Sequence, residues 1–301
     1  MTRYINLCNY SYEIDADKYS CIYGYTMGRC SQCSHIIKTK VMEYDELLEL
    51  LKSRIYVPNL KVFFGGGDNY SVTVANDIGI IVYSVLDERT TYISQYNGAI
   101  RESSGYMIFT ILKNHLNRYI FADGLIPIHS AFLGIEGDEG PSGTAIIGES
   151  GAGKSTLCYR IHSDLDYKIC ADDLIVYDPD KRNVLAGCKE FYLKEDIIRK
   201  YGLEAKCEKR NGKYALSLED NTVISTNRYR IIYLKRTGRF EKIEVALPSD
   251  YIIHDIRSWC RTKNEEKQYH SVESFFENAD SIVSGSYHDT DEILEALRNE
   301  K

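Results

Sequence analysis

The residues with the clearest chemical potential form a glycine-rich run, Gly148-Glu-Ser-Gly-Ala-Gly-Lys-Ser155, which fits the pattern G-x-x-x-x-G-K-[ST]. Because glycine has no Cβ, backbone N–H groups in such a run can converge on phosphate oxygens. An apolar strand is predicted just before the run, and an amphipathic helix is predicted to begin inside it. A helix N-terminus adds partial positive charge at the same place. The run therefore predicts a binding site for a nucleoside triphosphate.

Each part of this run has an expected role. Lys154 is expected to reach the β- and γ-phosphates, and the Ser155 hydroxyl is expected to hold Mg²⁺. The expected cofactors are therefore ATP and Mg²⁺. The residues expected to contact the nucleotide are Gly148, Glu149, Ser150, Gly151, Ala152, Gly153, Lys154, Ser155 and Thr156.

Two adjacent carboxylates, Asp172 and Asp173, end the next predicted strand, Lys168-Ile-Cys-Ala. An Asp at such a strand end can hold the metal, and neighbouring carboxylates repel unless a cation or a proton separates them. One Asp can serve the metal while the other accepts the proton of an attacking hydroxyl. The sequence leaves open which Asp does which. The expected metal ligands are Ser155, Asp172 and Asp173.

His129 lies in the apolar run Leu125–Ile135, which is predicted as a strand beside the strand of the glycine-rich run. A polar ring in such a strand could donate to a phosphate or orient an acceptor. A hydrogen-bonded core histidine fits the same pattern.

Three segments in this order, IHSAFLGIEG, AIIGESGAGKST and KICADDLIVYD, resemble the HPr kinase/phosphorylase superfamily, which includes the ATP-dependent phosphoenolpyruvate carboxykinases. The resemblance covers residues 125–200 well and 201–301 loosely. It implies a mixed α/β P-loop domain with Lys154, Asp172, Asp173 and His129 as catalytic residues. Thr156 stands where HPr kinase usually has Glu, and the Arg-Gly signature after the Asp pair is missing. Both departures favour an HPr-kinase-related protein rather than HPr kinase itself.

Two classes of function fit these residues. By resemblance, the first is a kinase that phosphorylates a small hydroxyl compound such as serine, or a hydroxyl on a peptide. The second is a nucleotide-dependent switch or assembly protein with little phosphoryl transfer. The second Asp favours the kinase, because a switch needs only one Asp for its metal.

The surrounding pattern predicts two domains, a smaller α+β domain over residues 1–102 and a mixed α/β kinase domain over 103–301. Residues 1–102 would recognise the acceptor or form a homo-oligomer. Their predicted elements are a helix at Met42–Lys52 and a strand meander of Tyr70–Ala75, Gly79–Asp87 and Thr91–Tyr96. A helix over 106–120 is placed in the second domain. Further along, Tyr229–Leu234 and Lys242–Ala246 are expected to pair, and a helix is expected after Pro248.

Composition narrows the function classes. The formal charge of −7 argues against a dedicated nucleic-acid binder. No apolar run reaches 18 residues, so no membrane span is expected. The N-terminal residues lack the apolar core of a signal peptide, so a cytoplasmic location is expected.

Two further groups of residues lie outside these motifs. Nine cysteines, an odd number, fit reduced thiols better than a disulfide framework. Cys8, Cys21, Cys30 and Cys33 have irregular spacing, which favours ordinary cysteines over a metal or redox site. A basic cluster is expected to be a solvated face, or to supply a cation that neutralises phosphate. Its members are Arg228, Arg230, Lys235, Arg236 and Arg239.

Overall fold

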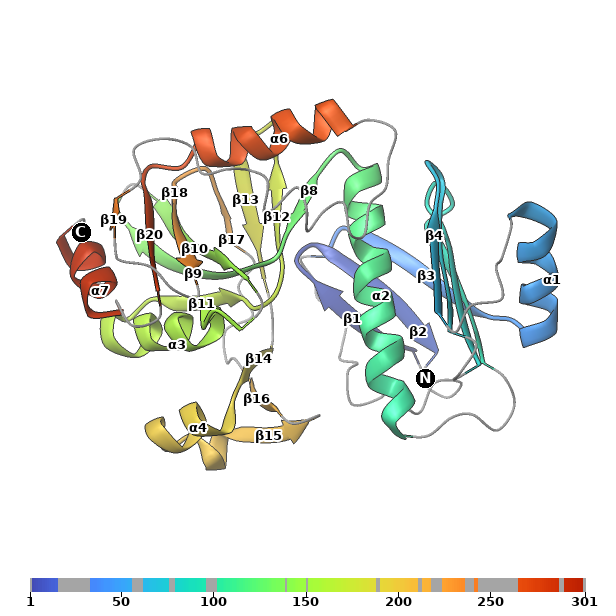
Figure 1. Cartoon of the computed structure of the whole chain (residues 1–301), viewed down its shortest axis with the longest axis horizontal. Coiled ribbons are helices and arrows are strands. Elements are labelled where there is room, and N and C mark those ends of the chain that lie inside the picture. Colours follow the sequence, from blue (N-terminus) through green and yellow to red (C-terminus); the bar gives the residue numbers. More distant parts are fainter. Residues whose placement is uncertain are drawn as a thin grey trace. The chain divides into compact units, whose positions relative to one another are not determined.

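The computed structural model describes residues 2–15, 33–55, 62–75, 79–95, 102–138, 140–149, 151–187, 190–210, 213–217, 224–235, 241–242, 265–286 and 290–299. These residues form two compact units, the first ending at Gly124 and the second beginning at Leu125 (Figure 1).

The first unit is built on a seven-stranded sheet in the order β1-β2-β3-β7-β6-β5-β4. The expected meander is confirmed, because β5, β6 and β7 pair antiparallel in sequence order. The strands are β1 (Thr2–Leu7), β2 (Tyr10–Asp15), β3 (His35–Val41), β4 (Val62–Gly66), β5 (Tyr70–Ala75), β6 (Ile80–Val85) and β7 (Thr90–Gln95).

In the described part of this unit, one helix packs on each face of the sheet. The expected first helix is α1 (Tyr44–Arg54), whose Leu47 and Leu51 pack with Val72 and other buried residues of one face. Because side chains alternate along a strand, Thr73 points to the other face, where it bonds to His115 of α2 (Glu102–Ala122). Helix α2 thus belongs to the first unit and not, as expected, to the second domain.

The second unit is a mixed α/β domain, as predicted. Its main sheet has the order β11-β9-β10-β18-β20-β19. Strands β10, β18 and β20 are parallel, and β9 and β19 run antiparallel to their neighbours. The strands are β9 (Ser130–Gly137), β10 (Gly140–Gly148), β11 (Lys168–Ala171), β18 (Tyr229–Lys235), β19 (Glu241–Lys242) and β20 (Ile282–Ser286).

Helices pack on both faces of this sheet. Helices α3 (Lys154–Leu165) and α7 (Thr290–Asn299) contribute Leu157 and Leu294 to a core that also holds Ile146 of β10. On the other face, Tyr229 of β18 stacks on Phe275 of α6 (Glu265–Glu277). The helix α3 is therefore fixed against the strand that precedes it in the chain.

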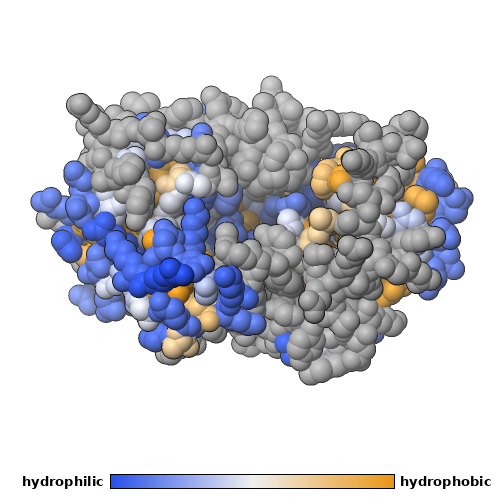
Figure 2. Space-filling view, turned by 60° about the horizontal axis from the view of Figure 1, so that its bottom comes forward, coloured by the Kyte–Doolittle hydropathy of each residue, from blue (hydrophilic) through white to orange (hydrophobic). Residues whose placement is uncertain are grey.

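The described residues of the second unit also form two smaller sheets. One has the order β17-β13-β12-β8, and the other has the order β14-β16-β15 and lies next to the helix α4 (Glu195–Tyr201) and the short helix η2 (Glu204–Lys206). In Figure 2, which brings the bottom of Figure 1 forward, the described surface of this unit is mainly hydrophilic. The strands are β8 (Ile126–Ile128), β12 (Ile175–Asp178), β13 (Asn183–Ala186), β14 (Glu190–Leu193), β15 (Cys207–Arg210), β16 (Lys213–Ser217) and β17 (Ile224–Thr226).

The predicted pairing of Tyr229–Leu234 with Lys242–Ala246 is wrong. The strand β18 lies between β10 and β20, and β19 pairs with β20 instead. Ile231, Ile232 and Leu234 are all buried, so both faces of β18 are covered, which is typical of a central strand in a partly parallel sheet. The helix expected after Pro248 lies outside the described residues.

Candidate active site

The glycine-rich run lies between the end of β10 and the start of α3. Gly148, Gly151 and Gly153 have φ angles of 147°, 81° and 97°, all in the region that favours glycine. A Cβ on Gly148 would lie 2.3 Å from the Leu234 carbonyl oxygen of β18, so no other residue fits there. The backbone thus begins its turn directly against the neighbouring parallel strand.

Lys154 reaches back across this loop. Its Nζ donates to the carbonyl oxygens of Gly148 at 2.8 Å and Glu149 at 3.3 Å. The ammonium group is therefore held over the loop, next to the N-terminus of α3. Of the other expected contacts, Ala152 is buried, Glu149 and Gly151 are exposed, Thr156 is half-buried in the first turn of α3, and Ser150 lies outside the described residues.

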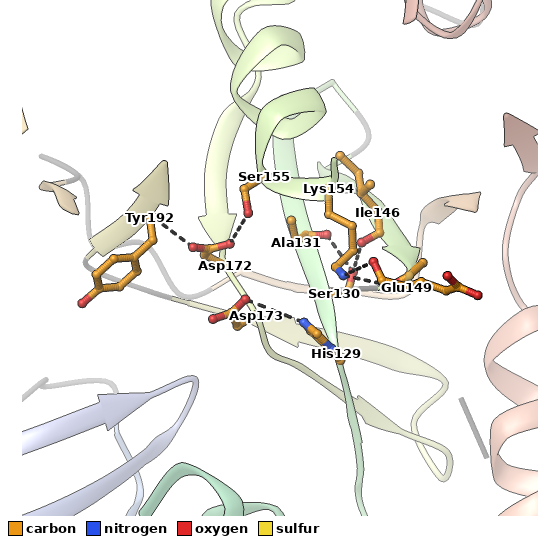
Figure 3. A network of polar contacts seen from close by, with 11 residues as sticks. His129, Ser130, Ala131, Ile146, Glu149, Lys154, Ser155, Asp172, Asp173 and Tyr192 are labelled. Atoms are coloured by element: carbon orange, nitrogen blue, oxygen red, sulfur yellow. Dashed lines mark hydrogen bonds and ion pairs between the residues drawn. The ribbon is translucent and has the colours of Figure 1, made fainter. Parts of the chain in front are cut away.

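Asp172 follows β11 and is fixed from two sides (Figure 3). One carboxylate oxygen accepts a hydrogen bond from the Ser155 hydroxyl at 3.1 Å. The other accepts one from the backbone N–H of Tyr192, in β14, at 2.9 Å. The residue is only 9% exposed. Both oxygens of this carboxylate are therefore oriented by the surrounding chain.

Asp173 points to a different partner. Its Oδ1 lies 3.7 Å from the Nε2 of His129, and its side chain is 38% exposed. Its φ of 71° is unusual for a residue other than glycine, although Asp tolerates this region better than most. The turn after β11 thus aims the two neighbouring carboxylates at different groups.

His129 does not lie within a strand, so the prediction of one continuous strand is wrong. Residues 126–128 pair with β12 in one sheet, and residues 130–137 pair with β10 in another. His129 is the residue at which the chain passes between the two sheets. Its ring is therefore 30% exposed and reaches Asp173, instead of being enclosed in a core. The neighbouring Ser130 hydroxyl donates to the Ile146 carbonyl oxygen and ties the passage to β10.

The oxygen donors at this site suit Mg²⁺. Ser155 Oγ and Asp172 Oδ1 are 3.1 Å apart. Adjacent ligands in an octahedron with Mg–O bonds of about 2.1 Å are about 3.0 Å apart. Among the described residues, no group of three or more His, Cys, Asp and Glu side chains is arranged to hold a metal. A hydroxyl and one carboxylate are the protein ligands expected where phosphate and water complete the shell.

Two of the four N-terminal cysteines lie among the residues that the structure describes. Cys8 and Cys33 are buried, and the Cys33 thiol lies 3.5 Å from the Cys8 carbonyl oxygen. Cys21 and Cys30 lie outside the described residues.

Comparisons with known proteins find a likeness among solved structures. No family model matches the chain, and no curated protein matches it. Among solved structures, the HPr(Ser) kinase/phosphatase from Coxiella burnetii matches 58% of this chain and 95% of its own, with 12% identity and a TM-score of 0.27. It has the name of the family that the sequence motifs resemble. In the part of the chain that the structure describes, no helix has the length and apolar character needed to cross a membrane.

Proposed function

We propose that the chain is a kinase, which binds ATP and Mg²⁺ at residues 148–156 and transfers the γ-phosphoryl group to a hydroxyl. The acceptor class is a small serine-like molecule or a serine of a peptide. The observation that carries the proposal is that the side chains of the two adjacent Asp residues contact different groups. The Asp172 carboxylate accepts a hydrogen bond from Ser155 at the start of α3, whereas the Asp173 carboxylate lies 3.7 Å from the His129 ring.

The loop and Lys154 would hold the phosphates. The backbone N–H groups at the start of α3 and the Lys154 ammonium are positive groups that suit phosphate oxygens. On binding, Lys154 would exchange its carbonyl partners for phosphate oxygens of the nucleotide. Ser155 and Asp172 would hold Mg²⁺, which when bound offsets charge on the β- and γ-phosphates.

Asp173 is the better candidate for the proton acceptor. The two oxygens of Asp172 are engaged by Ser155 and by the Tyr192 N–H, whereas the half-exposed Asp173 can meet an incoming hydroxyl. The carboxylate of Asp173 would take the proton of the acceptor hydroxyl while the oxygen of this hydroxyl forms a bond to the γ-phosphorus. The bond from this phosphorus to the β–γ bridging oxygen breaks, and ADP leaves. His129 would hold the Asp173 carboxylate in position.

The two carboxylates can be tested separately. Binding of ATP with and without Mg²⁺ is measured by calorimetry, and transfer is measured with γ-labelled ATP and a pool of hydroxyl compounds and peptides that includes serine. Asp173→Asn is expected to bind Mg·ATP within about twofold of wild type and to lose about 100-fold or more in transfer, the usual contribution of a general base. Asp172→Asn is expected to lose the Mg²⁺-dependent part of ATP affinity.

The exposed Asp180, in the turn after β12, gives the matched control. Asp180→Asn should change neither quantity. Transfer by Asp173→Asn at the wild-type rate would contradict the assignment of the base. Mg·ATP binding without any labelled product in wild type would favour a nucleotide-dependent switch.

A further inference from the structure

The basic residues around β18 lie at opposite ends of the strand. β18 runs parallel to β10, with Arg230 opposite Thr144 and Leu234 opposite Gly148. Lys235 is thus one residue beyond the partner of Gly148, at the end where the glycine-rich run begins. Arg230 is five residues away, about 16 Å along a strand. Arg236 and Arg239 lie outside the described residues.

The basic residues at the amino end have an acidic neighbour. Burial raises the pKa of the Asp280 carboxyl, and the positive charges of Arg228 and Arg230 oppose this rise. The Asp280 backbone N–H also donates to the Tyr229 carbonyl oxygen, which holds the residue at this end of the strand. Arg228 and Arg230 thus have a local electrostatic role, far from the glycine-rich run.

Lys235 lies beside the glycine-rich run. Hydrogen-bonded strands are about 4.8 Å apart, and Lys235 directly follows Leu234, the strand partner of Gly148. Ile232 and Leu234 point into the core beneath α3. By alternation, Tyr233 and Lys235 share the opposite face. A lysine side chain on this face at the strand end is long enough to reach over the start of the loop.

The charges around Tyr233 support this placement. Burial raises the pKa of its phenol, Glu149 raises this pKa further, and Lys235 lowers it. Both the Glu149 carboxylate and the Lys235 ammonium are therefore near the same phenol. Lys235 is half-buried, so its charge acts in a medium that screens less than bulk water.

We propose that Lys235 is a second phosphate-binding cation of this site, which contacts the β- and γ-phosphates of the nucleotide from β18 while Lys154 contacts them from α3. This inference rests on the proposed nucleotide binding and adds a residue to it. The negative charge of a triphosphate is larger than the combined positive charge of Lys154 and one Mg²⁺. A lysine ammonium, a compact point charge with three donors, suits phosphate oxygens.

The test compares nucleotides that differ in phosphate number. Dissociation constants for ATP, ADP, AMP and adenosine are measured with the full chain. Lys235→Gln is expected to weaken ATP and ADP by about 10- to 100-fold, the range for losing a hydrogen bond to a charged group. It is expected to leave adenosine within twofold of wild type. Lys235→Arg keeps the charge and should recover most of the affinity. Arg228→Gln, at the other end of the strand, is the matched control and should match wild type.

The outcomes separate the two proposals. If wild type binds ATP and Lys235→Gln has the same dissociation constants for every nucleotide, the role of Lys235 is overturned. The proposed nucleotide binding then stays intact. An equal loss for adenosine and ATP would also overturn it, because a phosphate contact cannot weaken adenosine. Wild type that binds no ATP in the presence of Mg²⁺ would overturn the proposed function itself. Thermal unfolding of each variant shows whether the fold is retained.

Discussion

Acidification is predicted to destabilise the first unit through one buried histidine. His115 of α2 is 2% exposed, and its two ring nitrogens lie 3.0 Å from Thr73 Oγ1 and 2.8 Å from Ser84 Oγ. A neutral imidazole has one donor and one acceptor, and hydroxyl groups can complement both. Burial lowers the pKa of His115 to about 3, and the positive charge of Arg118 contributes to the lowering.

The sign and the size of the effect follow from this shift. The unfolded chain binds the proton at its ordinary pKa of about 6.5, whereas the folded chain resists it down to about 3. The stability is therefore fully present above pH 6.5 and is lost as the pH falls toward 3. Each pH unit in this window lowers the free energy of unfolding by about 1.4 kcal/mol, so acidification to pH 5 lowers it by about 2 kcal/mol.

The assay is urea unfolding at pH 7 and pH 5, followed by circular dichroism, for wild type and His115→Gln. Between the two pH values, the free energy of unfolding should fall by about 2 kcal/mol more in wild type than in the variant. His270→Gln, which alters an exposed histidine of α6, should behave as wild type. An NMR titration of the wild-type His115 ring should show no protonation down to pH 4.5. Equal losses in wild type and His115→Gln, or a ring that titrates near pH 6.5, would refute the reasoning.

Two further predictions concern the second unit. Gly148→Ala should lower the free energy of unfolding by about 3 kcal/mol or more and abolish ATP binding, because its Cβ would meet the Leu234 carbonyl oxygen at a φ that only glycine adopts readily. Gly151→Ala, with a φ of 81° but open space around its Cβ, should cost about 1 kcal/mol, and equal urea midpoints for the two variants would contradict this. Burial raises the pKa of the Cys170 thiol to about 12, so iodoacetamide at pH 8 should label Cys170 only after unfolding in urea. Labelling of native Cys170 as fast as the partly exposed Cys207, read by peptide mass mapping, would contradict the burial.

Local patterns predicted the parts of this protein that are contiguous in sequence. The glycine-rich run between strand and helix was readable because the turn, the helix start and Lys154 lie within one short segment. The helix expected over 106–120 is also confirmed within α2, whose buried face includes Ile108, Leu112 and Leu116. Periodicity could not tell which sheet that face covers, because the partner strands are distant in sequence. The helix was therefore placed in the wrong unit.

The site itself depends on contacts between distant segments. The sequence showed two equivalent carboxylates, and only the turn after β11 distinguishes them by aiming one at Ser155 and the other at His129. The Tyr192 contact to Asp172 uses a backbone N–H, so no residue type could have signalled it. The sequence alone does not distinguish Lys235 from the other basic residues of its cluster. The register of β18 against β10 places it beside Gly148.

Phosphoryl transfer is the measurement that tests the central claim most directly. Wild type and the double variant Asp172→Asn/Asp173→Asn are incubated with γ-labelled ATP, Mg²⁺ and the pool of hydroxyl metabolites and peptides, and labelled acceptor is scored against free phosphate. A kinase predicts labelled product in wild type that disappears in the double variant. ATP binding with only trace free phosphate, equal in both proteins, would contradict the account.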